Sequence, residues 1–258
     1  MHRPLVAYDG IAIAELLFYL LALAAAVSLC LKHGFTKDLG WRAILVLALV
    51  RIIGSALRLA TIHDPHNINL YIGWQVLDSI GIAPLLLLLI GLLGRALASI
   101  PAAAPGKLSI HAAHRRAVLL LLAASVVLFA VGGSRSRVEV VAGQPTTDYS
   151  QITKVAVVLH IVVLAATAAG LALAAARIGN VPARERKVVH AVALCLPFVA
   201  VRLAYTCLLV FGGKKSSPWL YLGLSSLPEM FVTFVGVILG LRLDVLPKDA
   251  VPIPQSDC

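Results

Sequence analysis

The sequence predicts an all-α, polytopic membrane protein built as one bundle of seven transmembrane helices. Of its 258 residues, 60% are hydrophobic and only 13% are charged, which is far more apolar than a soluble domain requires. The apolar residues form long unbroken runs and do not alternate with polar ones, as the strands of a membrane barrel would. Crossing the hydrocarbon core takes a helix of about 20 residues, and seven runs are long enough.

The seven expected helices are joined by short connections. We place the helices near residues 10–32, 42–62, 70–94, 115–133, 152–176, 187–211 and 218–241. The two longest connections, near 95–114 and 134–151, are rich in Ala, Pro, Gly, Ser and Thr, so neither is expected to bury a core of its own. Residues 243–258 form a short tail. The chain is therefore expected to be a single membrane domain.

The distribution of Lys and Arg outside the expected helices predicts the orientation. Thirteen of these residues lie on the side of the C-terminus and six on the side of the N-terminus. The positive-inside rule then places the N-terminus outside or in the lumen and the C-terminal tail in the cytosol. Since membrane topology accounts for the net charge of +10, no nucleic-acid partner is expected.

Several ionisable side chains fall inside the expected helices, where a charge in contact with hydrocarbon is costly and usually marks a functional cavity. At 1.5 Å per residue, most of them lie within roughly 6–17 Å of the lumenal surface. These residues are Glu15, Arg51, Arg58, Asp78, His160, Arg202 and Glu229. Their shared depth predicts one polar site in that half of the bundle.

Three of these groups are the candidate catalytic residues. Asp78 and Glu229 are acidic, deep and on different helices. A carboxyl group in an apolar cavity can stay protonated near neutral pH and then serve as a general acid. His160 is a third candidate for proton transfer, although a single His on an apolar helix is more often a hydrogen-bonded packing residue.

The other four groups are expected to pair charges. Arg51, Arg58 and Arg202 can form interhelical ion pairs with the carboxylates, and Glu15 is a further partner. Two alternatives stay open. Arg58 and Glu15 are close enough to the interface to extend their charged ends to water, and the pairs could simply hold the bundle together.

Aromatic side chains share helix faces with the charges. Trp74 precedes Asp78 by four residues, and Phe198 and Tyr205 flank Arg202 on the sixth expected helix. Aromatic faces attract cations, so Trp74, Phe198 and Tyr205 are expected to line a site in which positive charge develops on carbon.

Three prolines lie inside the expected helices. Pro84, Pro197 and Pro228 are expected to interrupt the third, sixth and seventh helices, because proline removes a backbone donor. Kinked helices around polar residues make a pocket plausible.

Sequence motifs for metal-dependent chemistry are missing. There is no DDxxD or NDxxD motif for magnesium diphosphate, and no HExxH, GxSxG or cluster of His ligands. We therefore expect no metal site and no cofactor. Acid–base chemistry on a lipophilic molecule, transport and sensing stay open.

Three segments carry a resemblance to a known family. These are RIIGSALRLATIHDP from Arg51, LDSIGIAPLLLLLIGLLGR from Leu77 and SSLPEMFVTFVGVILGL from Ser225. Together they resemble small fungal seven-helix proteins, and in particular the membrane-bound terpene cyclases of meroterpenoid pathways, of the ascochlorin and macrophorin type. The resemblance extends over nearly the whole chain.

The resemblance implies a metal-independent cyclase of the endoplasmic reticulum membrane. Its substrate would be a lipophilic molecule with a prenyl chain on an aromatic or cyclohexenone core. Asp78 or Glu229 would protonate a terminal alkene or epoxide, Trp74 and Tyr205 would shield the carbocations, and the other carboxylate or His160 would remove the last proton.

A second hypothesis needs no chemistry. The chain is also similar in size and topology to a fungal family of lipid-translocating exporters, and the charges would then form an ion-paired gate or the binding site of a transporter, flippase or sensor. The sequence leaves the oligomeric state open, and membrane lipids are the other expected partners.

Overall fold

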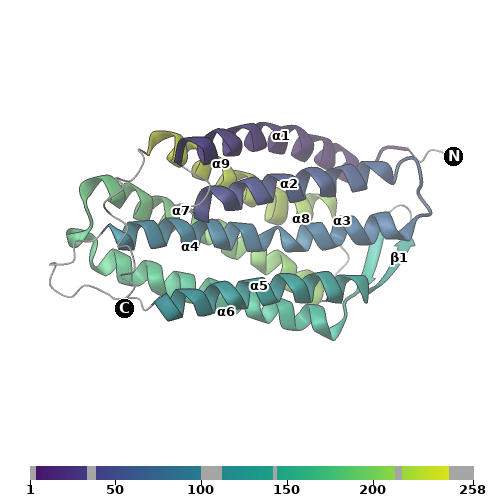
Figure 1. Cartoon of the computed structure of the whole chain (residues 1–258). Helices are drawn as coiled ribbons and strands as arrows, with labels where there is room; N and C mark the ends of the chain where they lie inside the picture. The colour runs from purple at the N-terminus through teal and green to yellow at the C-terminus, as the bar shows by residue number, and fades with distance from the viewer. Residues whose placement is uncertain (1–3, 34–38, 100–111, 142–143, 213–216, 244–258) are drawn as a thin grey trace, which may run out of the picture.

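The protein is a bundle of long helices with one β-hairpin at its end (Figure 1). The computed structural model describes residues 4–33, 39–99, 112–141, 144–212 and 217–243. Its elements are α1 (Ala7–His33), α2 (Leu39–Ala60), α3 (Ile68–Ile80), α4 (Ile82–Ala98), α5 (Ala112–Ser134), β1 (Arg137–Val141), β2 (Gln144–Asp148), α6 (Gln151–Ala176), the 3-10 turn η1 (Ile178–Asn180), α7 (Ala183–Val210), α8 (Pro218–Tyr221), the π-helical segment η2 (Leu222–Ser226) and α9 (Leu227–Arg242).

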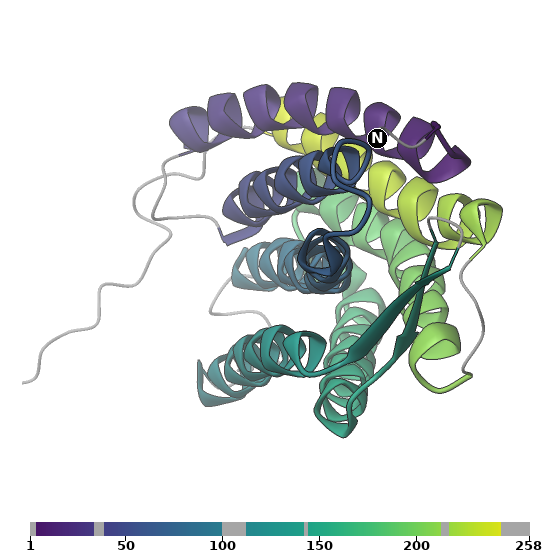
Figure 2. The same cartoon turned by 90° about the vertical axis from the view of Figure 1, so that its right-hand side faces the viewer.

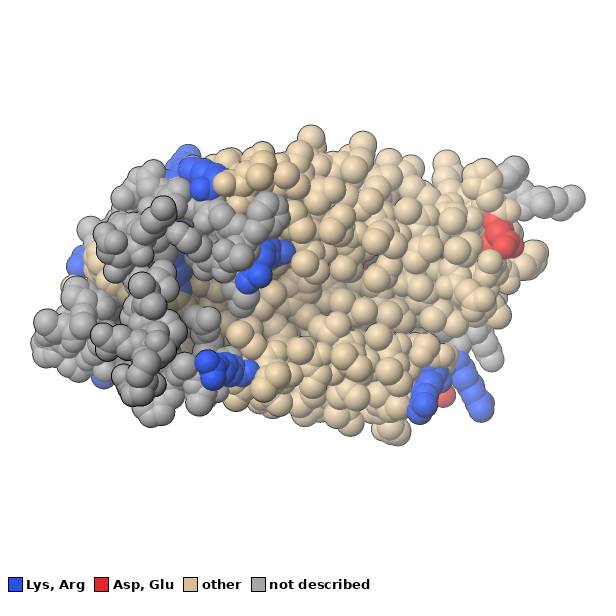
Figure 3. All heavy atoms as spheres, viewed as in Figure 1, with Lys and Arg blue, Asp and Glu red and all other residues tan. Residues whose placement is uncertain are grey.

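Seven helical segments in the described part of the chain are long and apolar enough to cross a membrane, as predicted. They cover Ala7–Lys32, Gly40–Ala60, Ile68–Ala98, Arg116–Ser134, Gln151–Ala176, Glu185–Val210 and Pro218–Arg242. On the face shown in Figure 3, the charged atoms of the described residues lie toward the two ends, and a broad uncharged belt separates them. An uncharged belt of this kind is the surface expected to face the hydrocarbon core, and helices of this length can cross that core.

The third expected helix consists of two helices in sequence, α3 and α4, which meet at Gly81. Pro84 accounts for the break, because it has no N–H to donate to the carbonyl of Ile80 and its ring crowds that carbonyl. The Gly81 N–H, shared between the carbonyls of Leu77 and Asp78, closes the end of α3. The sixth expected helix differs from the prediction, since α7 runs unbroken through Pro197.

The last expected helix begins as α8, widens into the π-helical η2 and continues as α9. The N–H of Leu227 bonds to the carbonyl of Leu222, five residues earlier. Pro228 follows at once and offers no N–H, so the wide turn lies where the sequence analysis expected a kink.

The sequence does not predict the hairpin. Strands β1 and β2 pair antiparallel, with Arg137 opposite Asp148 and Val141 opposite Gln144. Figure 2 shows the hairpin crossing the end of the bundle, from α5 and α6 toward α7 and α8. We call this the hairpin end; α1 and α3 also begin there (Figure 1). The other end, where α4 stops and α7 starts, is the opposite end.

The apolar core lies mainly around α4. Its side chains Leu85, Leu86 and Leu89 are fully buried, and α2, α6 and α7 pack around it. Helix α9 approaches its neighbours closely because it carries glycine there: a Cβ on Gly240 would lie 2.8 Å from the Trp41 ring. Close approach through small residues is the usual way for helices to pack in lipid.

Candidate functional site

The centre of the site is Arg51 on α2, which joins acids from two other helices. Its Nη1 lies 2.6 Å from Oδ1 of Asp78 on α3. Its Nε and Nη2 donate to the two carboxylate oxygens of Glu229 on α9, which makes a bidentate ion pair. Arg51 and Glu229 are buried, and the side chain of Asp78 is 12% exposed. Planar guanidinium groups suit such paired recognition of carboxylates.

A second arginine closes the group into a ring. Arg202 on α7 places Nη2 3.2 Å from Oδ2 of Asp78 and Nε 3.3 Å from Oε2 of Glu229. Its Nη2 also donates to the backbone oxygen of Asp78, at 2.7 Å. The Tyr19 hydroxyl donates to Glu229 at 3.0 Å. Two arginines and two carboxylates thus compensate one another inside the bundle, as buried charges must.

Glu15 on α1 has different partners from those expected. Among the described residues it accepts hydrogen bonds from hydroxyl groups only: Ser226 at 2.7 Å, Tyr221 at 2.9 Å and Ser55 at 3.4 Å. It is 2% exposed. Because the four-residue ring is already balanced, an ionised Glu15 adds one uncompensated buried charge, whereas a protonated Glu15 leaves the cluster neutral. Burying an uncompensated charge is the costlier state.

Tyr221 connects Glu15 to the ring. Its hydroxyl oxygen lies 2.9 Å from Oε1 of Glu15 and 3.2 Å from Oδ1 of Asp78. A phenol has one proton and can donate to only one of these oxygens at a time. Both contacts can be hydrogen bonds at the same time if Glu15 is protonated. The Glu15 carboxyl then donates a hydrogen bond to the Tyr221 oxygen, and the Tyr221 hydroxyl donates one to Asp78. The three groups therefore form a chain along which a proton can move.

The π-helical segment explains why Tyr221 faces the cluster. Glu229 follows Tyr221 by eight positions, a spacing that in a regular α-helix does not bring the two side chains to the same face. The wide turn at η2 absorbs one additional residue, so that both side chains point inward. Pro228 and the wide turn thus place Tyr221 within reach of Glu15 and Asp78.

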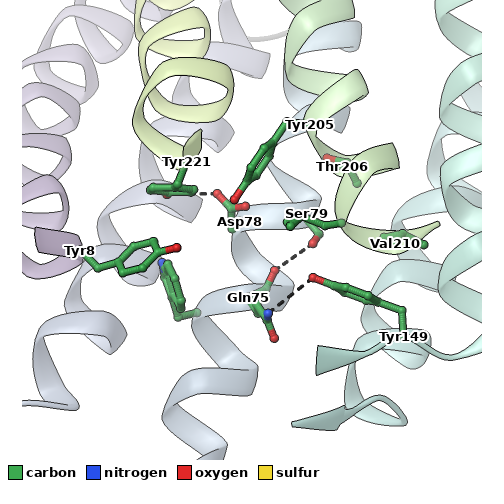
Figure 4. Close-up of a pocket in the computed structure, with 11 residues that line it drawn as sticks. Tyr8, Gln75, Asp78, Ser79, Tyr149, Tyr205, Thr206, Val210 and Tyr221 are labelled. Atoms are coloured by element: carbon green, nitrogen blue, oxygen red, sulfur yellow. Dashed lines mark hydrogen bonds between the residues drawn. The ribbon is translucent and has the colours of Figure 1, made fainter. Parts of the chain in front are cut away.

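A small cavity adjoins Asp78 and Tyr221 (Figure 4). Its volume is about 20 Å³, which is room for about one water molecule. Aromatic rings form much of its wall, and amide and hydroxyl groups line the rest. The lining residues are Tyr8, Trp74, Gln75, Asp78, Ser79, Tyr149, Tyr205, Thr206, Leu209, Val210 and Tyr221.

The chain that carries the cluster and the cavity matches a known protein-family model. A protein-family model described as a domain of unknown function, DUF7702, matches residues 5–246. This chain is a member of the DUF7702 family. The match spans all the helices that build the site. A comparison with curated proteins finds no match.

Arg58 in this DUF7702 chain lies beside the cavity wall and has an acidic partner other than Glu15. Its Nε is 3.1 Å from Oδ1 of Asp9, and both side chains are fully buried. Helix α1 begins at Ala7, earlier than the sequence analysis placed it, which brings Asp9 into the first turn. The Arg58 guanidinium also lies 4.9 Å from the Trp74 ring centre and 5.1 Å from that of Tyr8. These contacts hold two of the cavity's aromatic rings.

Two predicted site residues of the DUF7702 chain contact other parts of the bundle. His160 on α6 lies 3.0 Å from the backbone oxygen of Ala156 and 3.5 Å from the Ser125 hydroxyl of α5. Phe198 on α7 packs against Phe231 of α9, with ring centres 4.3 Å apart. Neither lines the cavity. By contrast, Trp74 and Tyr205 lie in its wall, as expected.

The opposite end of the DUF7702 chain holds another buried ion pair. Arg95, in the last turn of α4, places Nη2 3.2 Å from Oε1 and Nε 3.3 Å from Oε2 of Glu185, in the first turn of α7. Both side chains are at least nine-tenths buried. The described residues contain no group of three or more His, Cys, Asp or Glu that could hold a metal ion.

Proposed function

We propose that this DUF7702 protein is a membrane-bound terpene cyclase that closes the prenyl chain of a lipophilic meroterpenoid intermediate. The observation that carries the proposal is the chain from Glu15 through Tyr221 to Asp78 beside an aromatic-lined cavity. In this proposal Glu15 is the neutral acid, Tyr221 delivers the proton to the substrate and Asp78 is the base, which are the groups that an acid-initiated cyclisation needs. No cofactor takes part in this proposal.

Glu15 replaces Asp78 and Glu229 as the proposed proton source. Both of those carboxylates pair with two arginines, which favours their ionised form. Glu15 meets only hydroxyl groups among the described residues. In the proposed reaction Tyr221 gives its proton to a terminal alkene carbon or epoxide oxygen and regains one from Glu15.

The ring closure itself is redox-neutral. The alkene electrons of the chain attack the cation and form the new carbon–carbon bonds. Asp78 then accepts a proton from the carbon next to the last cation, which leaves a double bond. The proton returns from Asp78 through Tyr221 to Glu15, so the product is an isomer of the substrate. Trp74, Tyr205 and Tyr221 present aromatic faces to the developing positive charge.

A prenylated substrate requires the cavity to widen, because about 20 Å³ accommodates only water. We propose that α8 and η2 move to admit it. The regular hydrogen-bond pattern is already interrupted there, and α8 is a single turn of four residues. Tyr221 lies at the junction of these two segments, so opening and proton delivery would be coupled.

The proposal includes an orientation and a compartment. The excess of Lys and Arg beyond the helices on the side of the opposite end supports a cytosolic location for that end and a lumenal one for the hairpin end. A multi-span protein that acts on prenylated intermediates would reside in the endoplasmic reticulum membrane, with membrane lipids around its apolar belt.

A transporter or sensor is the second candidate, and the size of the cavity favours it. A water-sized space beside interlocked charges also suits a gate that opens only when a ligand or proton binds. The buried Arg95–Glu185 pair at the opposite end would be a second closure on the other side of the membrane.

A conversion assay separates the two candidates. Microsomes that contain the protein are incubated with a farnesylated phenol or cyclohexenone, with and without a terminal epoxide, and products are resolved by mass-resolved chromatography. A cyclase produces a compound of unchanged mass with an added ring. Loss of general acid–base catalysis reduces the rate about 10²–10⁴-fold, so Glu15→Gln and Tyr221→Phe should abolish the product at normal protein level.

Glu185→Gln is the matched control, because it removes a buried carboxylate far from the cavity and should leave product formation intact. If well-folded protein converts neither substrate, the cyclase proposal fails and transport or sensing takes its place. If Glu15→Gln keeps full activity, the acid has been assigned to the wrong residue.

A further inference from the structure

The β1–β2 hairpin covers the end of the bundle that holds the cavity. Figure 2 shows the two strands extending from α5 and α6 across that end toward α7 and α8. Tyr149, the residue directly after β2, contributes to the cavity wall, and Figure 4 shows its hydroxyl pointing toward Gln75 of α3. The hairpin therefore lies between the cavity and the space beyond the end of the helices.

Two side-chain contacts with one residue fasten the hairpin to α3. The Thr147 hydroxyl of β2 donates to Oε1 of Gln75 at 2.8 Å, and Nε2 of Gln75 donates to the Tyr149 hydroxyl at 3.5 Å. Burial raises the pKa of Tyr149 above its usual range, so this phenol stays neutral and keeps its hydrogen-bonding capacity. Gln75 thus holds the hairpin with both ends of its amide.

A second small space lies under the hairpin. Its volume is about 10 Å³, and its lining includes Phe129, Thr147 and Thr153. Gln75, Ser79 and Tyr149 line both this space and the cavity at Asp78. The side chains of Gln75, Ser79 and Tyr149 therefore border both spaces, and a movement of Gln75 and Tyr149 is the change that would connect them beneath the hairpin.

The way in which the hairpin is attached would allow it to move about its base. At its base, Ser150 donates to the backbone oxygen of Gly132 at 2.9 Å, and the Ser136 hydroxyl accepts from the Ser150 N–H at 3.2 Å. A single two-stranded hairpin is marginally stable by itself and depends on such contacts. Its base is held at the ends of α5 and α6, and among the described residues Gln75 makes the side-chain hydrogen bonds that tie it to α3, so loss of these bonds would let it swing about its base.

We propose that the β1–β2 hairpin is a gate, latched by Gln75, through which small polar species enter the cavity from the water at the hairpin end. The aqueous route is separate from the proposed widening at α8 and η2. It concerns access and does not depend on which reaction the site performs, so its test uses chemical labelling and not product formation.

The test places a reporter cysteine in the cavity wall. Leu209→Cys is introduced after Cys30, Cys195, Cys207 and Cys258 have been replaced by alanine, and the protein is reconstituted into lipid vesicles. A charged, water-soluble methanethiosulfonate reagent then labels the reporter. We expect Gln75→Ala to increase the labelling rate about tenfold, since it removes both latch hydrogen bonds. Asn67→Ala is the matched control, because it alters the cap of α3 at the same end.

Locking the gate gives the opposite result. A disulfide between Gln75→Cys and Thr147→Cys should reduce labelling of the reporter at least tenfold, and reduction should restore it, as read from the mass of the Leu209→Cys peptide. Equal acceleration by Gln75→Ala and Asn67→Ala, or unchanged labelling of the locked protein, would overturn the gate. A third outcome is that the charged reagent labels the reporter in neither the locked nor the unlocked protein, whereas a lipid-soluble maleimide labels it in the locked protein. The reporter would then be reached from the bilayer, and the gate would be wrong.

Discussion

The two ends of the bundle bury charge in different ways. Toward the hairpin end, four helices contribute Arg51, Asp78, Arg202 and Glu229 to one ring, and a fifth adds Glu15 through hydroxyl groups. At the opposite end, Arg95 and Glu185 form one ion pair between two helices. A pair of this kind joins two elements. The ring with Glu15 joins five helices, and its hydrogen bonds also offer a path for a proton.

Three buried glutamates in the described part of the chain make this comparison quantitative. Glu229 faces two arginines, Glu185 faces one, and Glu15 faces only hydroxyl groups among the described residues. The same substitution, Glu→Gln, removes a negative charge and keeps the size of the side chain at all three. Its cost in the free energy of unfolding should follow the number of cations left without that charge.

Glu229→Gln should have the largest effect. It leaves Arg51 and Arg202 with Asp78 as their shared carboxylate, and breaking a buried pair usually costs about 3–5 kcal/mol. We expect the free energy of unfolding in detergent to fall by about this amount, measured by denaturant titration. A loss below about 1 kcal/mol would show that the ring does not hold the helices together.

Tyr221→Phe should come second. It removes the hydroxyl that contacts both Glu15 and Asp78, and an unsatisfied buried polar group costs about 1–3 kcal/mol. We expect a loss near the upper part of this range in the same titration. Tyr205→Phe, in the same cavity wall, is the comparison for removal of a hydroxyl outside the proton chain.

Glu185→Gln should cost less, about 1 kcal/mol. The amide still accepts a hydrogen bond from Arg95, and that arginine lies in the last turn of α4, where the helix dipole favours a cation. The melting temperature of the purified protein measures the change. A loss as large as that of Glu229→Gln would remove the contrast between the two ends.

Glu15→Gln should have the smallest effect on stability, within about 0.5 kcal/mol. A protonated carboxyl and an amide are both neutral, the amide oxygen can still accept from Ser226, and the amide NH2 can donate to Tyr221 in place of the carboxyl proton. Denaturant titration again gives the value. A cost similar to that of Glu229→Gln would mean that Glu15 is ionised in the folded protein.

Much of the fold follows from the sequence, because crossing lipid imposes a length and an apolar composition on each helix. The positions of Arg51, Asp78, Arg202 and Glu229 in one site also follow, since charges at one depth in a bundle must compensate one another. The hairpin was not expected: its strands have five residues each, and they pack on the end of the bundle without a core of their own.

Partner choice within the site could not be derived in the same way. Which acid meets which arginine depends on how α1, α3 and α9 pack, and depth along each helix does not determine this. Asp9 was placed just outside the first helix, so its pairing with Arg58 was missed. Tyr221 was missed because a regular helical period does not bring it to the face of Glu229, and only the wide turn at η2 does.

The most direct test of the account is the protonation state of Glu15. Infrared spectroscopy of the reconstituted protein distinguishes the C=O stretch of a protonated carboxyl from the bands of a carboxylate. We expect a protonated-carboxyl band at neutral pH that shifts in deuterium oxide, disappears in Glu15→Gln and persists in Glu185→Gln. A band that survives in Glu15→Gln, or no such band in the unaltered protein, would contradict a proton held at Glu15 for delivery through Tyr221.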